Sequence, residues 1–449
     1  AHVWIGLQGD YDDNGNVSWS YPAYYRHTAC PYRIWGTATL NTDQFTCGSS
    51  RLFDRNEWGS DIFGNTMPAP GDSAAWNQVW NRSGQMLNEA FSHAKDIGVK
   101  TALGTELTMG KEPAGPEAGY DWARVMPPDL QSRVADPYDP STVKNVYKAV
   151  FERIMKTHPL DYYLLWSWEV WTMWGYSTEQ VQAFKDDMNR AQEALAELDN
   201  PFQIGHAGWI LGTSDNPAEF EDTFPPEAPF YGLWDEADGF ESLSAERVKW
   251  PASWLEEDWG LGQPQIEVNR IWRYVKAAWD KSCDGMIAKH WRTKALLANA
   301  PGLKDIPWCY GPTGTPLSKG VPSDEDAYID DVYLDWATRQ FGPEAAQSIA
   351  DILSAEDTKG SAEQIALPSI MDWETEDQSD YAQAAPGAIM RNSASWSSEQ
   401  SKYTFVDDLN ALRPQIVGAG NLERFDYLLD CMKSYKLMAE YGCVRDDYE

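Results

Sequence analysis

Residues 161–169, DYYLLWSWE, carry the clearest indication of the fold. Apolar and aromatic side chains dominate this segment, which predicts a strand that ends at Glu169. Helical apolar stripes precede and follow this run, at residues 143–154 and 181–195. A buried strand between two amphipathic helices is the repeating unit of a parallel sheet.

The same alternation recurs through the first two-thirds of the chain. Further strands are predicted at residues 2–7, 51–53, 100–104, 202–209, 230–234, 250–255 and 285–291. The total of about eight strands, with helices between most of them, favours a closed (β/α)8 barrel, or TIM barrel, over an open sheet. No GxGxxG or Walker loop follows the first strand, which argues against a nucleotide-binding fold.

The alternation stops after Pro301, and only helical patterns follow. One stripe runs from Ile329 to Phe341 and ends at Gly342, and another lies at residues 425–435, whereas residues 355–400 are polar and loop-like. We therefore expect a catalytic barrel over residues 1–320 and a C-terminal helical appendage, packed on the barrel, over residues 321–449.

Composition and charge exclude several classes of protein. The chain has 449 residues, of which 43% are hydrophobic, so it is long enough to bury a large core. Its formal net charge of -33 repels nucleic acids and anionic membranes. No apolar run approaches the roughly 18 residues of a membrane span. We expect neither a nucleic acid nor a membrane as a partner, and the sequence does not fix the oligomeric state.

The cysteines and histidines point to no metal or cofactor. The six cysteines fall into sequence-local pairs with no zinc spacing, and disulfides between the members of each pair are the expectation, with buried thiols as the alternative. HExxH is absent, and the loop at residues 10–15 has only part of a calcium-loop pattern. The first residue, Ala1, fits removal of a signal peptide, so we expect a secreted or periplasmic protein. The pairs are Cys30 with Cys47, Cys283 with Cys309, and Cys431 with Cys443.

Carboxylates recur at the ends of the predicted strands, where a parallel barrel places its active site. Hydrolysis of a glycosidic bond needs two carboxyl groups. Glu169 lies in the most aromatic part of the chain, WSWEVW at residues 166–171, and burial beside Trp favours a protonated acid. We predict Glu169 as the acid and Glu256 as the second carboxyl group, although Glu257 or Asp258 could take the second role.

Other strand-end residues are candidates for binding sugar. Carboxylates would accept hydrogen bonds from sugar hydroxyls, or else form salt bridges within loops. Basic groups would bind a hydroxyl, a sulfate or a carboxylate, or else play a structural part. Trp rings would stack on sugar faces, or else pack in the core. The carboxylates are Glu106, Asp235, Glu236 and Asp258, the basic groups are His290 and Arg292, and the aromatic residues are Trp209, Trp234 and Trp291.

With Glu169 after the fourth predicted strand and Glu256 after the seventh, residues 1–300 resemble the retaining (β/α)8 glycosidases of clan A. In those families the acid/base follows strand four and the nucleophile follows strand seven. The resemblance therefore implies retention, with Glu169 as acid/base and Glu256 as nucleophile. Trp168 stands where the clan usually has Asn directly before its acid/base, so the resemblance is one of architecture.

Three short segments are similar to poorly characterised secreted bacterial glycoside hydrolases of marine polysaccharide breakdown. They are WLEED at residues 254–258, GWILG at 208–212 and HWRT at 290–293. This resemblance implies an algal galactan, such as agar, porphyran or carrageenan, as the substrate. Two other functions stay open, namely a catalytically inactive carbohydrate-binding barrel and a polysaccharide lyase.

Overall fold

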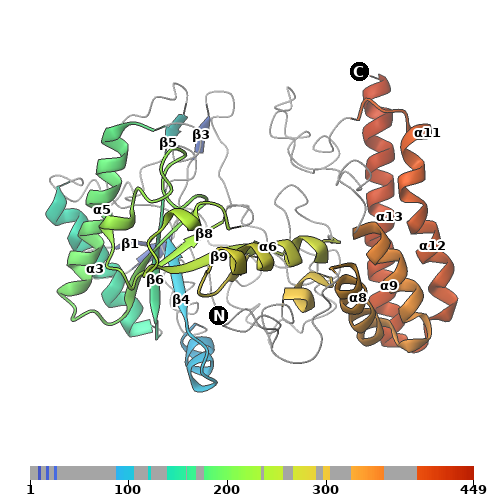
Figure 1. Cartoon of the computed structure of the whole chain (residues 1–449), viewed down its shortest axis with the longest axis horizontal. Coiled ribbons are helices and arrows are strands. Elements are labelled where there is room, and N and C mark those ends of the chain that lie inside the picture. The colour runs from blue at the N-terminus through green and yellow to red at the C-terminus, as the bar shows by residue number, and fades with distance from the viewer. Residues whose placement is uncertain are drawn as a thin grey trace. The chain divides into compact units, whose positions relative to one another are not determined.

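The computed structural model describes residues 9–11, 17–19, 25–27, 87–105, 120–122, 139–157, 159–167, 176–233, 237–255, 266–289, 297–303, 325–357 and 392–448. The chain divides into two compact units. One comprises residues 1–234 and 238–250, and the other comprises residues 235–237 and 251–449. Figure 1 shows the helices and strands of both units. The predicted division near residue 320 stays a prediction.

The main sheet has six strands in the order β10-β9-β8-β7-β6-β4. The pairs β4–β6, β6–β7, β7–β8 and β9–β10 are all parallel. Each of the six strands overlaps a segment predicted from the sequence, so these predictions are confirmed, whereas the strands predicted at residues 2–7 and 51–53 lie outside the described residues. The bounds are β4 (Ala102–Thr105), β6 (Tyr162–Trp166), β7 (Gln203–Gly208), β8 (Pro229–Gly232), β9 (Val248–Trp254) and β10 (Ile287–Lys289).

Aromatic contacts show that the sheet is curled. In a flat sheet β6 and β9 would lie about 14 Å apart, because two strands separate them. The rings of Tyr162 on β6 and Trp250 on β9 nevertheless meet edge to face, with centroids 4.9 Å apart. Closer to the strand ends, Trp166 and Tyr231 approach to 6.2 Å across Ala207, the small residue paired with both. The curled parallel sheet forms part of a barrel, as the predicted fold requires.

Two long helices cover the face of the sheet opposite to Trp166 and Tyr231. They are α3 (Pro140–Thr157), which connects β4 to β6, and α5 (Thr178–Ala196), which connects β6 to β7. Figure 1 shows them side by side, and Lys144 and Lys148 of α3 both bind Glu197 just after α5. Phe151 of α3 packs edge to face on Tyr163 of β6, with ring centroids 5.0 Å apart. These helices match the stripes predicted from the sequence.

The next two connections differ from a regular βα repeat. Only the short 3-10 helix η2 (Glu221–Thr223) lies between β7 and β8, and the described residues between β8 and β9 hold the short 3-10 helix η4 (Phe240–Ser242) and no α-helix. Phe220 and Phe224, beside η2, are buried and supply the apolar cover that a helix would provide. A helix returns in the next connection, where α6 (Val268–Asp280) lies between β9 and β10.

Gly205 in β7 has no room for a side chain. A Cβ atom there would lie 2.5 Å from the carbonyl oxygen of Pro229 and 2.9 Å from a methyl group of Leu164. Gly205→Ala is expected to lower the free energy of unfolding by about 1–3 kcal/mol, because overpacking moves the backbone of two paired strands. Urea unfolding measures this. Gly420→Ala is the control, since its Cβ would meet only Arg424 at an ordinary 3.5 Å; equal stability of both variants would contradict the prediction.

Short strands form two further sheets, both antiparallel. In one, β1 (Gly9–Tyr11) pairs with β2 (Val17–Trp19). In the other, β3 (Tyr25–His27) pairs with β5 (Tyr120–Trp122). Both lie in the first of the two units.

The described residues after 324 are mainly helical and share a core with α6. Tyr333, Ile349, Leu409 and Phe425, from four different helices, are all fully or almost fully buried there. The stripes at 329–341 and 425–435 are confirmed as helices, but α9 was not predicted, because three of its buried residues are small alanines that give a weak apolar signal. The bounds are α8 (Glu325–Phe341), α9 (Pro343–Asp357), α11 (Trp396–Glu399), α12 (Thr404–Leu412) and α13 (Ala419–Tyr448), with the 3-10 helices η8 (Gln400–Tyr403) and η9 (Arg413–Gln415).

Candidate functional site

The carboxyl ends of four strands meet along one edge of the sheet in the first unit. The register pairs Thr105 with Leu165, Trp166 with Ala207, and Gly208 with Gly232. Each strand therefore ends at the same edge. The residues that follow β4, β6, β7 and β8 within three positions include, in order, the predicted Glu106, Glu169, Trp209 and Trp234. The topology thus brings the chain to one edge just before each of these candidates.

Backbone hydrogen bonds extend the sheet beyond the strand ends. The Ser167 amide donates to the carbonyl of Ala207 at 2.8 Å, so the chain stays bound to β7 until two residues before Glu169. The Leu233 amide donates to the carbonyls of both Gly208 and Trp209, at 3.0 and 3.2 Å. The segments that lead to Glu169 and Trp234 are therefore fixed by the neighbouring strand.

Trp209 is the one predicted site residue within the described part of the chain. It directly follows β7 and is half-buried. Its carbonyl oxygen accepts a hydrogen bond from the Leu233 amide. The position at a strand end agrees with the prediction, whereas the stacking on a sugar stays a prediction.

His206 is a core residue, although the sequence places it near the end of a strand. It is fully buried against the rings of Phe220, Phe224 and Phe230, on the face of β7 opposite to Ala207. Burial, aided by the charge of nearby Arg247, lowers the pKa of His206 to about 3. The imidazole is therefore neutral at neutral pH and acts as part of the apolar packing.

The second unit holds another parallel strand end. Trp254 pairs with Lys289, and the Leu255 amide continues the pairing by donating to the Lys289 carbonyl at 2.9 Å. Lys289 also places its ammonium group 3.7 Å from the centroid of the Trp254 ring, a close cation–π contact. Glu256 follows Leu255 directly and His290 follows Lys289, so both candidates come immediately after this paired segment.

The remaining predicted site residues lie outside the described residues, and their roles stay predictions. They are Glu106, Glu169, Trp234, Asp235, Glu236, Glu256, Asp258, His290, Trp291 and Arg292. Sequence reasoning missed Lys289 because it was read as an interior position of its strand. The only indication in the sequence that this strand ends in basic side chains was the presence of His290 and Arg292 nearby.

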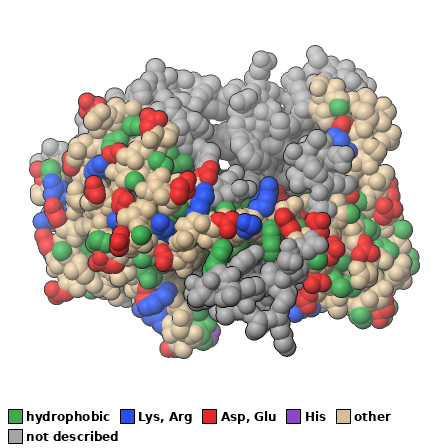
Figure 2. Space-filling model, viewed as in Figure 1, with side chains coloured by type: hydrophobic (Ala, Val, Ile, Leu, Met, Phe, Trp, Pro, Cys, Tyr) green, Lys and Arg blue, Asp and Glu red, His purple; other side chains and the backbone are tan. Residues whose placement is uncertain are grey.

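Neither a metal centre nor a membrane span occurs in the described part of the chain. Within it, no group of three or more His, Cys, Asp and Glu side chains could hold a metal ion. Its helices include none long and apolar enough to cross a membrane. Figure 2 shows Asp and Glu side chains spread over the visible surface, in line with the net charge of -33.

One predicted disulfide is wrong. Cys431 and Cys443 both lie on α13. They are twelve positions apart, which is about 18 Å along the helix axis, whereas the Cα atoms of a disulfide lie within about 7 Å of each other. The pair was predicted because the two cysteines are close in sequence, but a continuous helix keeps Cys431 and Cys443 far apart in space. The other two predicted pairs each include a cysteine outside the described residues.

A scan against protein-family models finds no match, and a search of the curated proteins finds none either. Among solved structures, the chain is similar to a GH138 enzyme targeting pectin rhamnogalacturonan II, with a TM-score of 0.43 and 10% sequence identity. The match covers 81% of this chain and 59% of that chain. The pectin substrate is a property of that protein.

Proposed function

We propose that this protein is a glycoside hydrolase that cleaves a polysaccharide or oligosaccharide with two carboxyl groups. The observation that carries the proposal is the alignment of parallel strand ends directly before the candidate residues. Thr105, Trp166 and Gly208 end three neighbouring strands at one edge, and a Glu or Trp follows each within three positions. In parallel barrels this edge is where catalytic residues gather.

In the proposed mechanism Glu169 is the acid/base and Glu256 is the nucleophile. Glu169 protonates the leaving glycosidic oxygen while Glu256 attacks the anomeric carbon to form a glycosyl ester. Glu169 then removes a proton from water, which attacks the anomeric carbon and releases Glu256. Two inversions give net retention, and the aromatic sequence around Glu169 favours its protonated form at the start.

The fold, substrate and location complete the proposal. We propose that residues 1–320 close a full (β/α)8 barrel and that residues 321–449 form a helical region packed on it. The substrate is a marine algal galactan of the agar, porphyran or carrageenan type. The protein acts after secretion, outside the cell or in the periplasm.

An activity screen tests the proposal. Purified full-length chain is incubated with agar, porphyran, carrageenan and a set of plant polysaccharides, and products are identified by mass. We expect new reducing ends without ultraviolet absorbance, and proton NMR of the first-formed anomer shows retention. An unsaturated product absorbing in the ultraviolet would identify a polysaccharide lyase instead. Binding without any product would identify an inactive carbohydrate-binding barrel.

A further inference from the structure

A buried amide side chain holds the backbone directly before Glu256. Asn299 is the first of the helical residues 299–303 and is fully buried. Its Nδ2 donates to the carbonyl oxygen of Leu255 at 2.8 Å. Its Oδ1 accepts from the amide of Glu267 at 3.1 Å. One side chain therefore joins the end of β9 to the start of α6.

The segment held by Asn299 is fixed from other sides as well. The Leu255 amide is bound to the carbonyl of Lys289 on β10, and the Trp254 carbonyl accepts from Nη2 of Arg270 at 3.4 Å. The Leu255 carbonyl belongs to the peptide bond that leads into Glu256. Because that bond is planar, fixing the carbonyl also fixes the plane in which the chain leaves Leu255.

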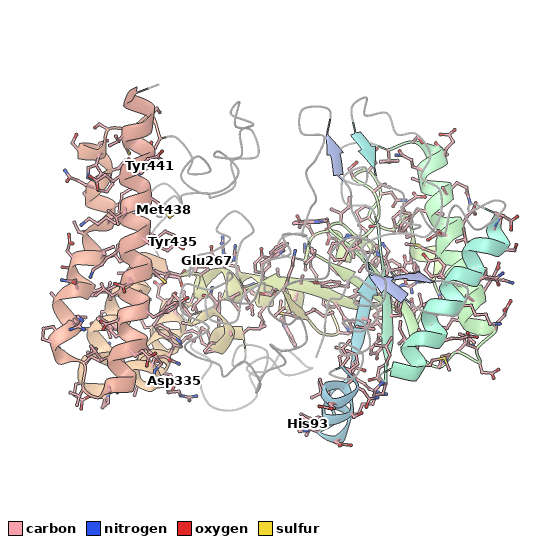
Figure 3. The ribbon with its side chains drawn as sticks, turned by 180° about the vertical axis from the view of Figure 1, so that it is seen from behind. His93, Glu267, Asp335, Tyr435, Met438 and Tyr441 are labelled. Carbon is pink, nitrogen blue, oxygen red and sulfur yellow. The ribbon has the colours of Figure 1, made fainter. Side chains whose placement is uncertain are left out.

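The start of α6 depends on partners from elsewhere in the chain. Glu267 occupies the N-cap position, labelled in Figure 3, and its side chain makes no capping hydrogen bond. Instead it pairs with Arg270, one turn along α6. The Asn269 amide donates to Oδ2 of Asp357 at the end of α9, and the Tyr333 hydroxyl of α8 donates to the same oxygen. Asn299 and Asp357 thus satisfy amides that a cap would otherwise bind.

We propose that Asn299 is a positioning residue for Glu256, acting through the Leu255 carbonyl. The inference rests on the proposed role of Glu256 as nucleophile. A Leu at position 299 would have the branching of Asn but no polar atoms, so the Leu255 carbonyl and the Glu267 amide would lose this partner. Asn299 therefore sets the orientation of the main chain before Glu256. Asp357 fixes the start of α6, to which Asn299 is also hydrogen-bonded.

Asn299→Ala is expected to lower kcat by roughly 10–100-fold with little change in KM, because small errors in placing a reacting group are costly. The probe is a 4-nitrophenyl glycoside that the wild type hydrolyses. Asn410→Ala is the matched control, since Asn410 is exposed on α12 of the same unit. An unchanged kcat in folded Asn299→Ala, beside an active wild type, would overturn the proposal and leave the proposed function intact.

Asn299→Asp distinguishes a role in positioning from a role in packing. It also tests the proposal if Asn299→Ala does not fold. A protonated carboxyl group donates to the Leu255 carbonyl, as the amide does, whereas a carboxylate repels it. The activity of this variant relative to the wild type should therefore rise as pH falls. A ratio that stays constant between pH 4 and pH 8 would show that the donor at position 299 does not matter.

Hydrogen–deuterium exchange gives a readout that needs no substrate. In Asn299→Ala, exchange at the Leu255 and Glu267 amides is expected to accelerate, whereas Asn410→Ala should match the wild type. Unchanged exchange would overturn the role of Asn299 in holding this segment. If the wild type cleaves no substrate but exchange accelerates in Asn299→Ala, the proposed function is wrong. The role of Asn299 in fixing the backbone at Leu255 and Glu267 is then still confirmed.

Discussion

Replacing Glu169 or Glu256 by Gln is expected to lower kcat by roughly 10²–10⁴-fold on the natural polysaccharide. Gln keeps the size of Glu but can neither donate the proton that the leaving oxygen needs nor attack the anomeric carbon. The two variants should differ on activated substrates. Glu169→Gln should keep much of its first step on a 4-nitrophenyl glycoside, whose leaving group needs no acid, whereas Glu256→Gln should lose activity on both.

Azide rescue assigns the two roles independently. In Glu169→Ala, azide should restore turnover and give a glycosyl azide of retained configuration; in Glu256→Ala it should give the inverted product. The matched control is Glu246→Gln, an exposed carboxylate just before β9, which should keep full activity. Near-full activity of both Gln variants on a substrate of the wild type would refute the assignment.

The helical part of the second unit is expected to lose stability as pH rises from 5 to 8. Burial raises the pKa of Asp357 from 3.8 to about 7, despite hydrogen bonds from Asn269 and Tyr333 and the charge of Arg270 that act in the opposite direction. Over this range the folded state binds the proton more tightly than the unfolded chain, so stability falls until the pH passes the folded pKa. The two pH units from 5 to 7 correspond to about 3 kcal/mol.

Asp357→Asn provides the comparison for this prediction. An amide keeps an oxygen that accepts from the Asn269 amide and the Tyr333 hydroxyl, but it carries no charge at any pH. The variant should unfold at a higher temperature than the wild type at pH 8, with a smaller difference at pH 5, as measured by calorimetry. Parallel pH profiles would show that the loss comes from the net charge of the whole chain rather than from Asp357.

The six strands of the main sheet and the long helices between them could be predicted because their signals are local. Continuous apolar runs such as residues 162–166 are buried on both faces, and stripes such as residues 143–154 bury one side of a helix. The strand ends before Glu169 and Glu256 were recognisable for the same reason. The connection around η2 could not be predicted, because Phe220 and Phe224 cover the sheet there without a helical period in the sequence.

The alternation of strands and helices could be predicted from the sequence, and so could the positions at which carboxylates and Trp follow strands, since both depend on neighbouring residues. The face of β7 that carries His206 is known only from the folded chain, where burial makes this residue part of the core. The tertiary structure also decided that Asn299 binds the Leu255 carbonyl and that Asp357 binds the Asn269 amide. These partners are 44 and 88 residues apart in the chain. A buried hydrogen bond between such distant segments has no local periodicity, so only the folded chain reveals it.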